Sequence, residues 1–114
     1  MQYVALIHAD QEGWEALDEK EQQVVFQRYM DFSKKNEVVG GAELEETDSA
    51  TTVRVRNGDR LVTDGPYAEV KEALGGFFIL ECGSIDEACQ LAAEIPAAER
   101  GAVEVRPVFV REES

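Results

Sequence analysis

Short apolar runs alternate along the chain with two longer segments of helical periodicity. The first run, Tyr3 to His8, has no helical period and predicts a strand. A helix is expected from Asp18 to about Asn36, because Asp18 and Glu21 form a capping-box pattern and apolar residues follow at helical spacing. Those apolar residues are Val25, Tyr29 and Phe32, flanked by Phe26 and Met30.

The middle of the chain predicts three extended segments. Val38 to Leu44 is expected to be a strand in which Gly40-Gly41 marks a bulge or a close backbone approach. Thr51 to Arg56 alternates apolar and charged side chains, and Asn57-Gly58 is a strong signal for a type I′ turn. The other strand of that hairpin is expected at Arg60 to Thr63.

The C-terminal third predicts a strand, a helix and a strand. Gly76 to Cys82 is the first strand, and Ser84 with Glu87 predicts a second capping box. Pro96 should end the helix that follows, and the last strand is expected at Ala102 to Val110. The apolar stripe of that helix consists of Ile85, Ala88, Cys89, Ala92 and Ile95.

Without the hairpin, the order of elements is the ferredoxin-like βαββαβ arrangement of the α+β class. A length of 114 residues suits a single domain, residues 1–114. Two helices cover only one face of such a sheet, yet the segments Tyr3 to Ile7 and Phe77 to Leu80 are apolar on both faces. Because both faces must be buried, we expect a homodimer packed sheet against sheet, with the ligand pocket between the sheets.

Composition narrows the range of partners. The chain has 24 acidic and 11 basic residues, a net charge of -13, so neither nucleic acid nor an anionic membrane is an expected partner. Cys82 and Cys89 show no metal-ligand spacing and are expected to be small core residues in a reducing cytoplasm. The N-terminus lacks a basic leader and no apolar stretch has transmembrane length, which predicts a cytoplasmic protein.

The stretch TDGPYAEVKEALGG, residues 63–76, fits neither a helix nor a strand along its whole length. Its Asp64-Gly65-Pro66-Tyr67, followed by Leu74-Gly75-Gly76-Phe77, resembles the signature of the DGPF group of YCII-related proteins, with Tyr67 in place of the usual Phe. The similarity continues in TTVRVR, residues 51–56, and in GAVEVRPV, residues 101–108.

The resemblance implies a ferredoxin-like protomer that pairs into a dimeric α/β barrel. It implies no established reaction. Relatives with the wider barrel fold carry out lyase, isomerase and dehalogenase reactions on small molecules, and a His–Asp pair in the cleft has been suggested as an acid/base site of YCII-like proteins. Some members of the group are associated with transcription because their genes lie beside those of alternative sigma factors.

Two residues are candidates for acid/base catalysis. Asp64 precedes Gly-Pro, so its carboxylate either ties down the turn or is held rigidly at the rim of the cleft as a proton donor or acceptor. His8 is the only histidine, with Asp10 two residues on and nominally on the same strand face. It is either a structural residue or a proton shuttle.

Three further residues are candidates for substrate binding. Arg106 could hold a carboxylate through two bonds, although local charge balance also explains it, and the same two explanations apply to Arg54. Tyr67 is expected to form a wall of the cavity. The sequence has no metal-binding motif and no phosphate-binding glycine loop, so neither a metal nor another cofactor is expected.

These residues support two hypotheses. The first is a cofactor-independent enzyme of the lyase or isomerase type, with Asp64 as acid/base, His8 assisting and Arg106 orienting an anionic small molecule. The second is a non-catalytic module that binds a ligand or a protein, and the resemblance implies a link to sigma-factor regulation for it. The fold does not decide between them, because one fold hosts many functions.

Overall fold

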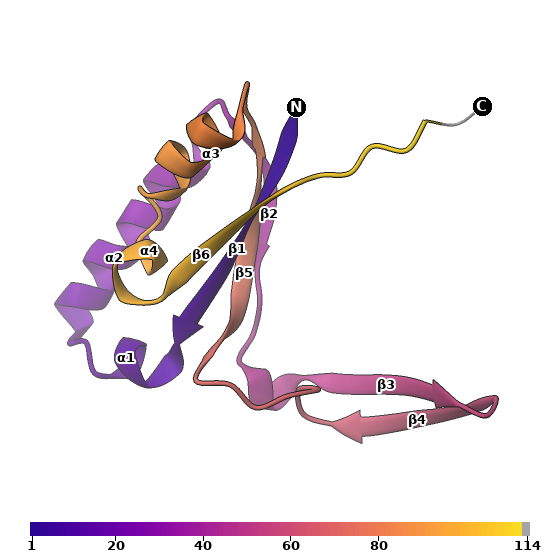
Figure 1. Cartoon of the computed structure of the whole chain (residues 1–114). Helices are drawn as coiled ribbons and strands as arrows, with labels where there is room; N and C mark the ends of the chain where they lie inside the picture. The colour runs from indigo at the N-terminus through magenta and orange to yellow at the C-terminus, as the bar shows by residue number, and fades with distance from the viewer. Residues whose placement is uncertain (113–114) are drawn as a thin grey trace.

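The computed structural model describes residues 1–112 and has an α+β architecture (Figure 1). Four strands form an antiparallel sheet in the order β2-β5-β1-β6, and two more form the separate hairpin β3-β4. This order is consistent with the predicted ferredoxin-like fold. The elements are β1 (Gln2–Asp10), α1 (Gln11–Glu15), α2 (Glu19–Ser33), β2 (Val38–Glu43), the 3-10 turn η1 (Thr47–Ser49), β3 (Thr51–Arg56), β4 (Asp59–Asp64), β5 (Glu72–Glu81), α3 (Ile85–Ala92), α4 (Ala97–Arg100) and β6 (Ala102–Pro107).

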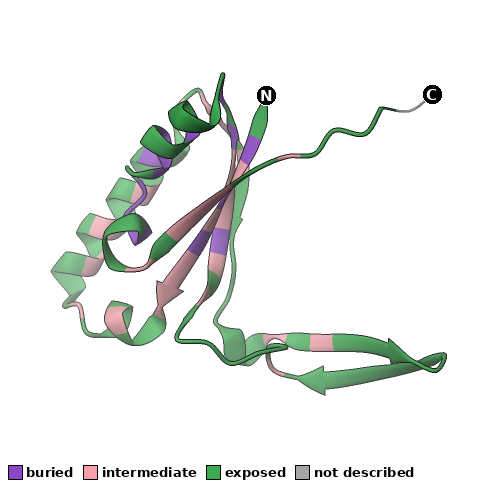
Figure 2. Ribbon diagram, viewed as in Figure 1, coloured by how far each residue is buried: buried purple, intermediate pink, exposed green. Residues whose placement is uncertain are grey.

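The core lies between the helices and one face of the sheet, where the buried residues gather in Figure 2. Alternate residues of β1 point into it, because successive strand side chains face opposite sides. Leu80 and Ile95 are completely buried there. The remaining buried apolar residues are Tyr3, Ala5, Ile7, Phe32, Cys82, Ala88, Leu91, Ala92 and Ala97.

Capping and turn residues in the sequence predicted most of the helices and strands correctly. Asp18 and Glu21 form the predicted reciprocal capping box of α2, although the helix ends at Ser33, earlier than expected. Asn57 and Gly58 both have positive φ, as a type I′ hairpin turn requires. The predicted irregularity in β2 is confirmed by a register shift between Val38 and Gly40.

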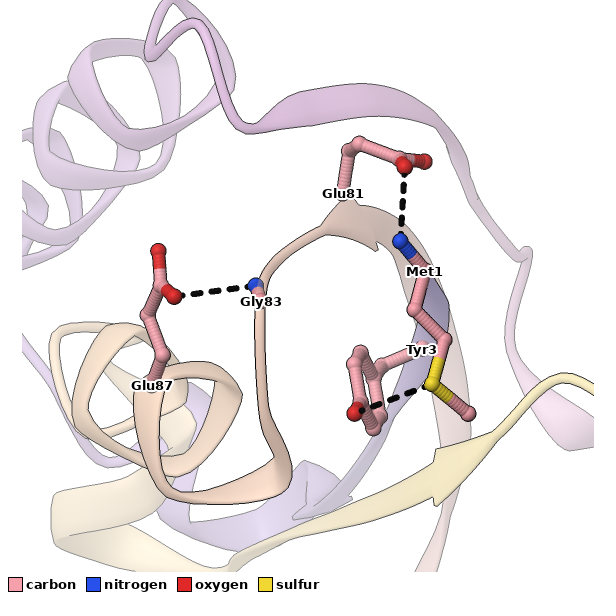
Figure 3. A network of polar contacts seen from close by, with 5 residues as sticks. All are labelled: Met1, Tyr3, Glu81, Gly83 and Glu87. Carbon is pink, nitrogen blue, oxygen red and sulfur yellow. Dashed lines mark hydrogen bonds and ion pairs between the residues drawn. The ribbon is translucent and has the colours of Figure 1, made fainter.

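Figure 3 shows two sets of polar contacts, one between the start of β1 and the end of β5, the other between the loop before α3 and that helix. The Met1 amino nitrogen lies 2.9 Å from Glu81 Oε1, and the Tyr3 hydroxyl donates to Met1 Sδ. The Gly83 amide donates to Glu87 Oε2 at 2.9 Å. These contacts lie at the end of the sheet away from His8, which pairs with Leu74 near the other end of β5.

The predicted capping box at Ser84 and Glu87 is only half formed. The Ser84 side chain accepts the Glu87 amide as predicted, but the Glu87 carboxylate accepts from Gly83, one residue before the expected partner. The prediction that Pro96 ends this helix is wrong: α3 ends at Ala92, and Pro96 caps the short helix α4.

Other sequence predictions also need correction. Cys82 is buried as expected, but Cys89 is exposed, because α3 faces the core through Ala88, Leu91 and Ala92. The segment directly after β1 forms the short helix α1, whose N-cap is Asp10. The final strand ends at Pro107, and β5 begins at Glu72, inside the signature stretch.

The other face of the sheet carries no helix of the described chain (Figure 1). We call it the open face; the register places on it Val4, Leu6, His8, Phe77, Ile79, Glu104 and Arg106. Its apolar members are only partly buried within one chain. The predicted second copy would cover them, but the homodimer remains a prediction.

The β3-β4 hairpin projects away from the sheet, on the side of the open face (Figure 1). Almost all of its residues are exposed (Figure 2). The described chain is correspondingly thin and extended, measuring 50 × 46 × 18 Å. None of the helices within residues 1–112 has the length and apolarity needed to cross a lipid bilayer.

Candidate functional site

Three polar residues lie together on the open face. Glu104 of β6 pairs directly with Leu6 of β1, and His8 is two residues further along β1 on the same face. Arg106 is two residues from Glu104 and also faces this side. The antiparallel register therefore makes Glu104 the diagonal neighbour of His8 and the same-face neighbour of Arg106.

Glu104 forms the centre of this cluster. Its Oε1 lies 3.4 Å from His8 Nε2, and its Oε2 accepts a 2.6 Å hydrogen bond from Arg106 Nε. The first distance suits an ion pair when the histidine is protonated. Nε2 is nevertheless shielded from solvent and has no hydrogen-bond partner within residues 1–112. A shielded nitrogen without a partner is uncommon and marks this position as a candidate for binding or proton transfer.

The charge state of Glu104 follows from its neighbours. The hydrogen bond from the Arg106 guanidinium lowers the pKa of the Glu104 carboxyl below its usual value of 4.5, with a smaller contribution from His8. The carboxylate is therefore ionised at neutral pH.

Gly101 allows β6 to begin close to the end of β1. A Cβ atom at this position would lie 2.2 Å from the His8 carbonyl oxygen and 3.2 Å from Glu72 Oε2. On β5 the register shifts opposite the Ile7–His8 step, so that His8 pairs with Leu74. His8 thus stands at an irregular end of the sheet, where bulges often re-aim side chains.

Asp10, the expected acidic neighbour of His8, is engaged elsewhere. Its Oδ1 accepts the Glu12 amide at the start of α1, and its Oδ2 lies 3.8 Å from Lys71 Nζ. The carboxylate that approaches the imidazole is Glu104, which the sequence analysis did not select as a site residue.

The other predicted site residues lie away from the open-face cluster. Asp64 is an exposed residue at the end of β4, opposite Thr51. A contact between Asp64 and His8 required neighbouring strands, but β1 lies between β5 and β6 while β4 pairs with β3. Tyr67 is 81% exposed in the loop after β4, and Arg54 is exposed on β3. Within one chain, only His8 and Arg106 of the five are brought together.

A single chain does not enclose the cluster. Two surface hollows lie on the helical layer, one between Trp14 and Phe26, the other between α2 and Pro96–Arg100. Neither hollow is lined by His8 or Glu104. Within residues 1–112, no group of three or more His, Cys, Asp or Glu side chains is arranged to hold a metal ion.

The Glu104–Arg106 pair gives a testable pH dependence. The lowered pKa of Glu104 means that the unfolded chain binds more protons in this range, so the pair contributes stability above pH 4.5 that is lost at lower pH. Urea unfolding should find Glu104→Gln less stable than wild type at pH 7, by a small amount because the pair is exposed. The difference should vanish towards pH 3. Glu45→Gln, in the loop after β2, is the control, and an equal pH-dependent loss there would contradict the assignment.

Two comparisons with known proteins cover nearly the whole chain. The family model of the YCII-related domain matches residues 1–112. The uncharacterized protein R00369 of Rhizobium meliloti (strain 1021) is 34% identical over 117 residues, which cover 95% of this chain and 92% of that protein. The narrower DGPF grouping remains a prediction from the signature stretch. The chain belongs to the family of YCII-related proteins.

Proposed function

We propose that the protein is a cofactor-independent acid/base enzyme that moves a proton beside a carbonyl group of a small anionic molecule. The observation that supports this most directly is His8 Nε2, which is shielded from solvent, makes no hydrogen bond and lies 3.4 Å from the ionised Glu104 carboxylate. His8 is the proton acceptor and donor, Glu104 stabilises the imidazolium, and Arg106 binds the substrate. The free thiols of Cys82 and Cys89 fit the proposed cytoplasmic location.

A second copy of the chain completes this site. The apolar part of the open face surrounds the cluster with Val4, Leu6 and Phe77, which one chain leaves partly exposed. Packing two open faces together would bury these residues and exclude water from the cluster. Lower local polarity strengthens the interactions of Glu104 and Arg106 with developing charge.

Arg106 is arranged to bind an anion. It contacts Glu104 through Nε, which leaves the two terminal amino groups of the guanidinium for a ligand carboxylate. In the proposed step, neutral His8 takes a proton from the carbon next to the carbonyl, and the electron pair moves onto the carbonyl oxygen as an enolate. The imidazolium then returns the proton to the same or an adjacent atom, so no oxidant or cofactor is consumed.

Proton exchange in D2O tests the proposal without knowledge of the product. Pyruvate and 2-oxobutanoate serve as probes, and proton NMR follows the loss of the signal beside the carbonyl. We expect the wild-type protein to accelerate exchange and His8→Ala to lower that catalysed rate by about 100-fold. Arg106→Lys should mainly raise the probe concentration needed for half-maximal rate, because it loses two-point binding.

Asp64→Asn is the matched comparison. Asp64 is exposed and lies outside the cluster, so this variant should keep the wild-type rate. If Asp64→Asn abolishes exchange and His8→Ala does not, the acid/base role belongs to Asp64. His8 is the only histidine, so its imidazole resonance reports binding unambiguously. A probe that shifts this resonance without exchanging its protons would favour the non-catalytic binding module.

A further inference from the structure

The β3-β4 hairpin, residues 51–64, forms an arm whose strands pair with no other strand of residues 1–112. Its two strands pair only with each other, and all but one of their residues are exposed. An isolated two-stranded hairpin is marginally stable in water, because half of its backbone edges and both faces remain solvated. A partner that covers one face would remove this weakness.

One face of the arm is suited to such a partner. Val53 pairs with Val62, and Val55 continues the same face two residues on. These three valines are between 55% and 62% exposed. The opposite face carries Arg54 beside Leu61. A row of exposed β-branched residues on one side is typical of a strand surface that packs against another surface.

The described chain is more extended than a compact domain of its length. The radius of gyration is 16.4 Å, whereas a compact chain of this length has about 13 Å. The arm extends from the same side of the sheet as the open face (Figure 1). A molecule seated on the open face would therefore lie alongside the arm.

Charge favours a second copy of the same chain as that molecule. The charged residues of the arm are Arg54, Arg56, Arg60, Asp59 and Asp64. With three bases and two acids the arm has a net charge of +1. Because the whole chain has a net charge of -13, the residues outside the arm have a net charge of -14. The valine face itself is neutral, because it carries Arg60 and Asp64, whereas Arg54 and Arg56 lie on the opposite face. The arm as a whole is therefore weakly attracted to the acidic body of another copy, and its valine face adds no repulsion.

We propose that the β3-β4 arm docks through its Val53, Val55 and Val62 face on the body of a second copy of this chain. The inference rests on the proposed dimer but adds a separate contact to it, outside the open face. Two arms in a symmetric dimer would each hold the other chain, as isologous contacts require.

Excision of the arm gives a direct test. The Gly65 amide donates to the Ala50 carbonyl at 2.7 Å, so residues 51–64 can be replaced by an Asn-Gly link without moving the ends. Sedimentation equilibrium should show a dimer Kd at least tenfold above that of the wild type. Val62→Asp should weaken dimerisation in the same way, whereas Leu61→Asp on the opposite face should have little effect. An unchanged Kd after excision, or equal effects of the two substitutions, would overturn the proposal.

Hydrogen exchange of the arm amides separates the arm from the dimer itself. We expect amides of β3 and β4 to become protected as the protein is concentrated through its dimer Kd and to lose that protection on dilution. Protection that persists in the dilute monomer would mean that the arm folds on its own chain. A dimer with unprotected arm amides would overturn the arm contact while leaving the open-face dimer and the proposed enzyme intact.

Discussion

Replacing Gly101 by alanine is expected to lower the free energy of unfolding by about 3 kcal/mol. The added Cβ would lie 2.2 Å from the His8 carbonyl oxygen and 3.2 Å from the Ala9 Cα, distances that force the backbone of β1 or β6 to move. The obstacle is backbone, which cannot rotate aside as a flexible side chain would. Urea unfolding of the two proteins at pH 7 measures the difference.

The control for this substitution is Gly13→Ala. A Cβ at Gly13 meets only Asp10 Cβ at 3.8 Å, an ordinary contact, and alanine favours the helix in which Gly13 lies. Its stability should be unchanged or slightly higher. A Gly101→Ala protein as stable as this control would show that β6 can separate from His8. The placement of Glu104 beside the imidazole would then be less constrained than the structure indicates.

Elements defined by local signals were predictable from the sequence. The capping box at Asp18 and the Asn57-Gly58 turn each depend on residues within four positions of one another. The start of helix α3 was predicted correctly, but the helix ends earlier than expected and its exposed Cys89 was assigned to the core. Ala88 and Cys89 are adjacent on a helix, and only packing against the sheet decides which of them faces inward.

The candidate site was less predictable because it depends on strand register. His8 and Arg106 were selected for their chemistry, and the structure places both against Glu104. Glu104 alternates with Arg106 on one strand, which indicated only local charge balance. Its approach to His8 depends on the pairing of β6 with β1, which the sequence does not show. For Asp64 the local structure was predicted, but its position in the fold was not. Its turn was recognised, but sheet topology places it on a hairpin that does not adjoin β1.

The substitution Phe77→Asp should have the largest effect on self-association. Phe77 lies on the open face and pairs with Leu6 of β1, which pairs on its other side with Glu104 of β6. In the proposed dimer it would be buried near the centre of the interface, where aromatic residues contribute most to binding. A carboxylate there would be desolvated without a partner. We expect the dimer Kd to rise by about 100-fold or more, as measured by sedimentation equilibrium.

Val24→Asp provides the matched control, since it also replaces an apolar side chain by a charge. Val24 is 56% exposed on α2, in the helical layer on the other side of the sheet, so its substitution should leave the dimer Kd unchanged. Circular dichroism must show that both variants are folded. If Phe77→Asp is folded and associates as the wild type does, the open face is not the dimer interface. The dimer would then not enclose the site at His8, because a single chain leaves Phe77, Leu6 and Val4 partly exposed to solvent.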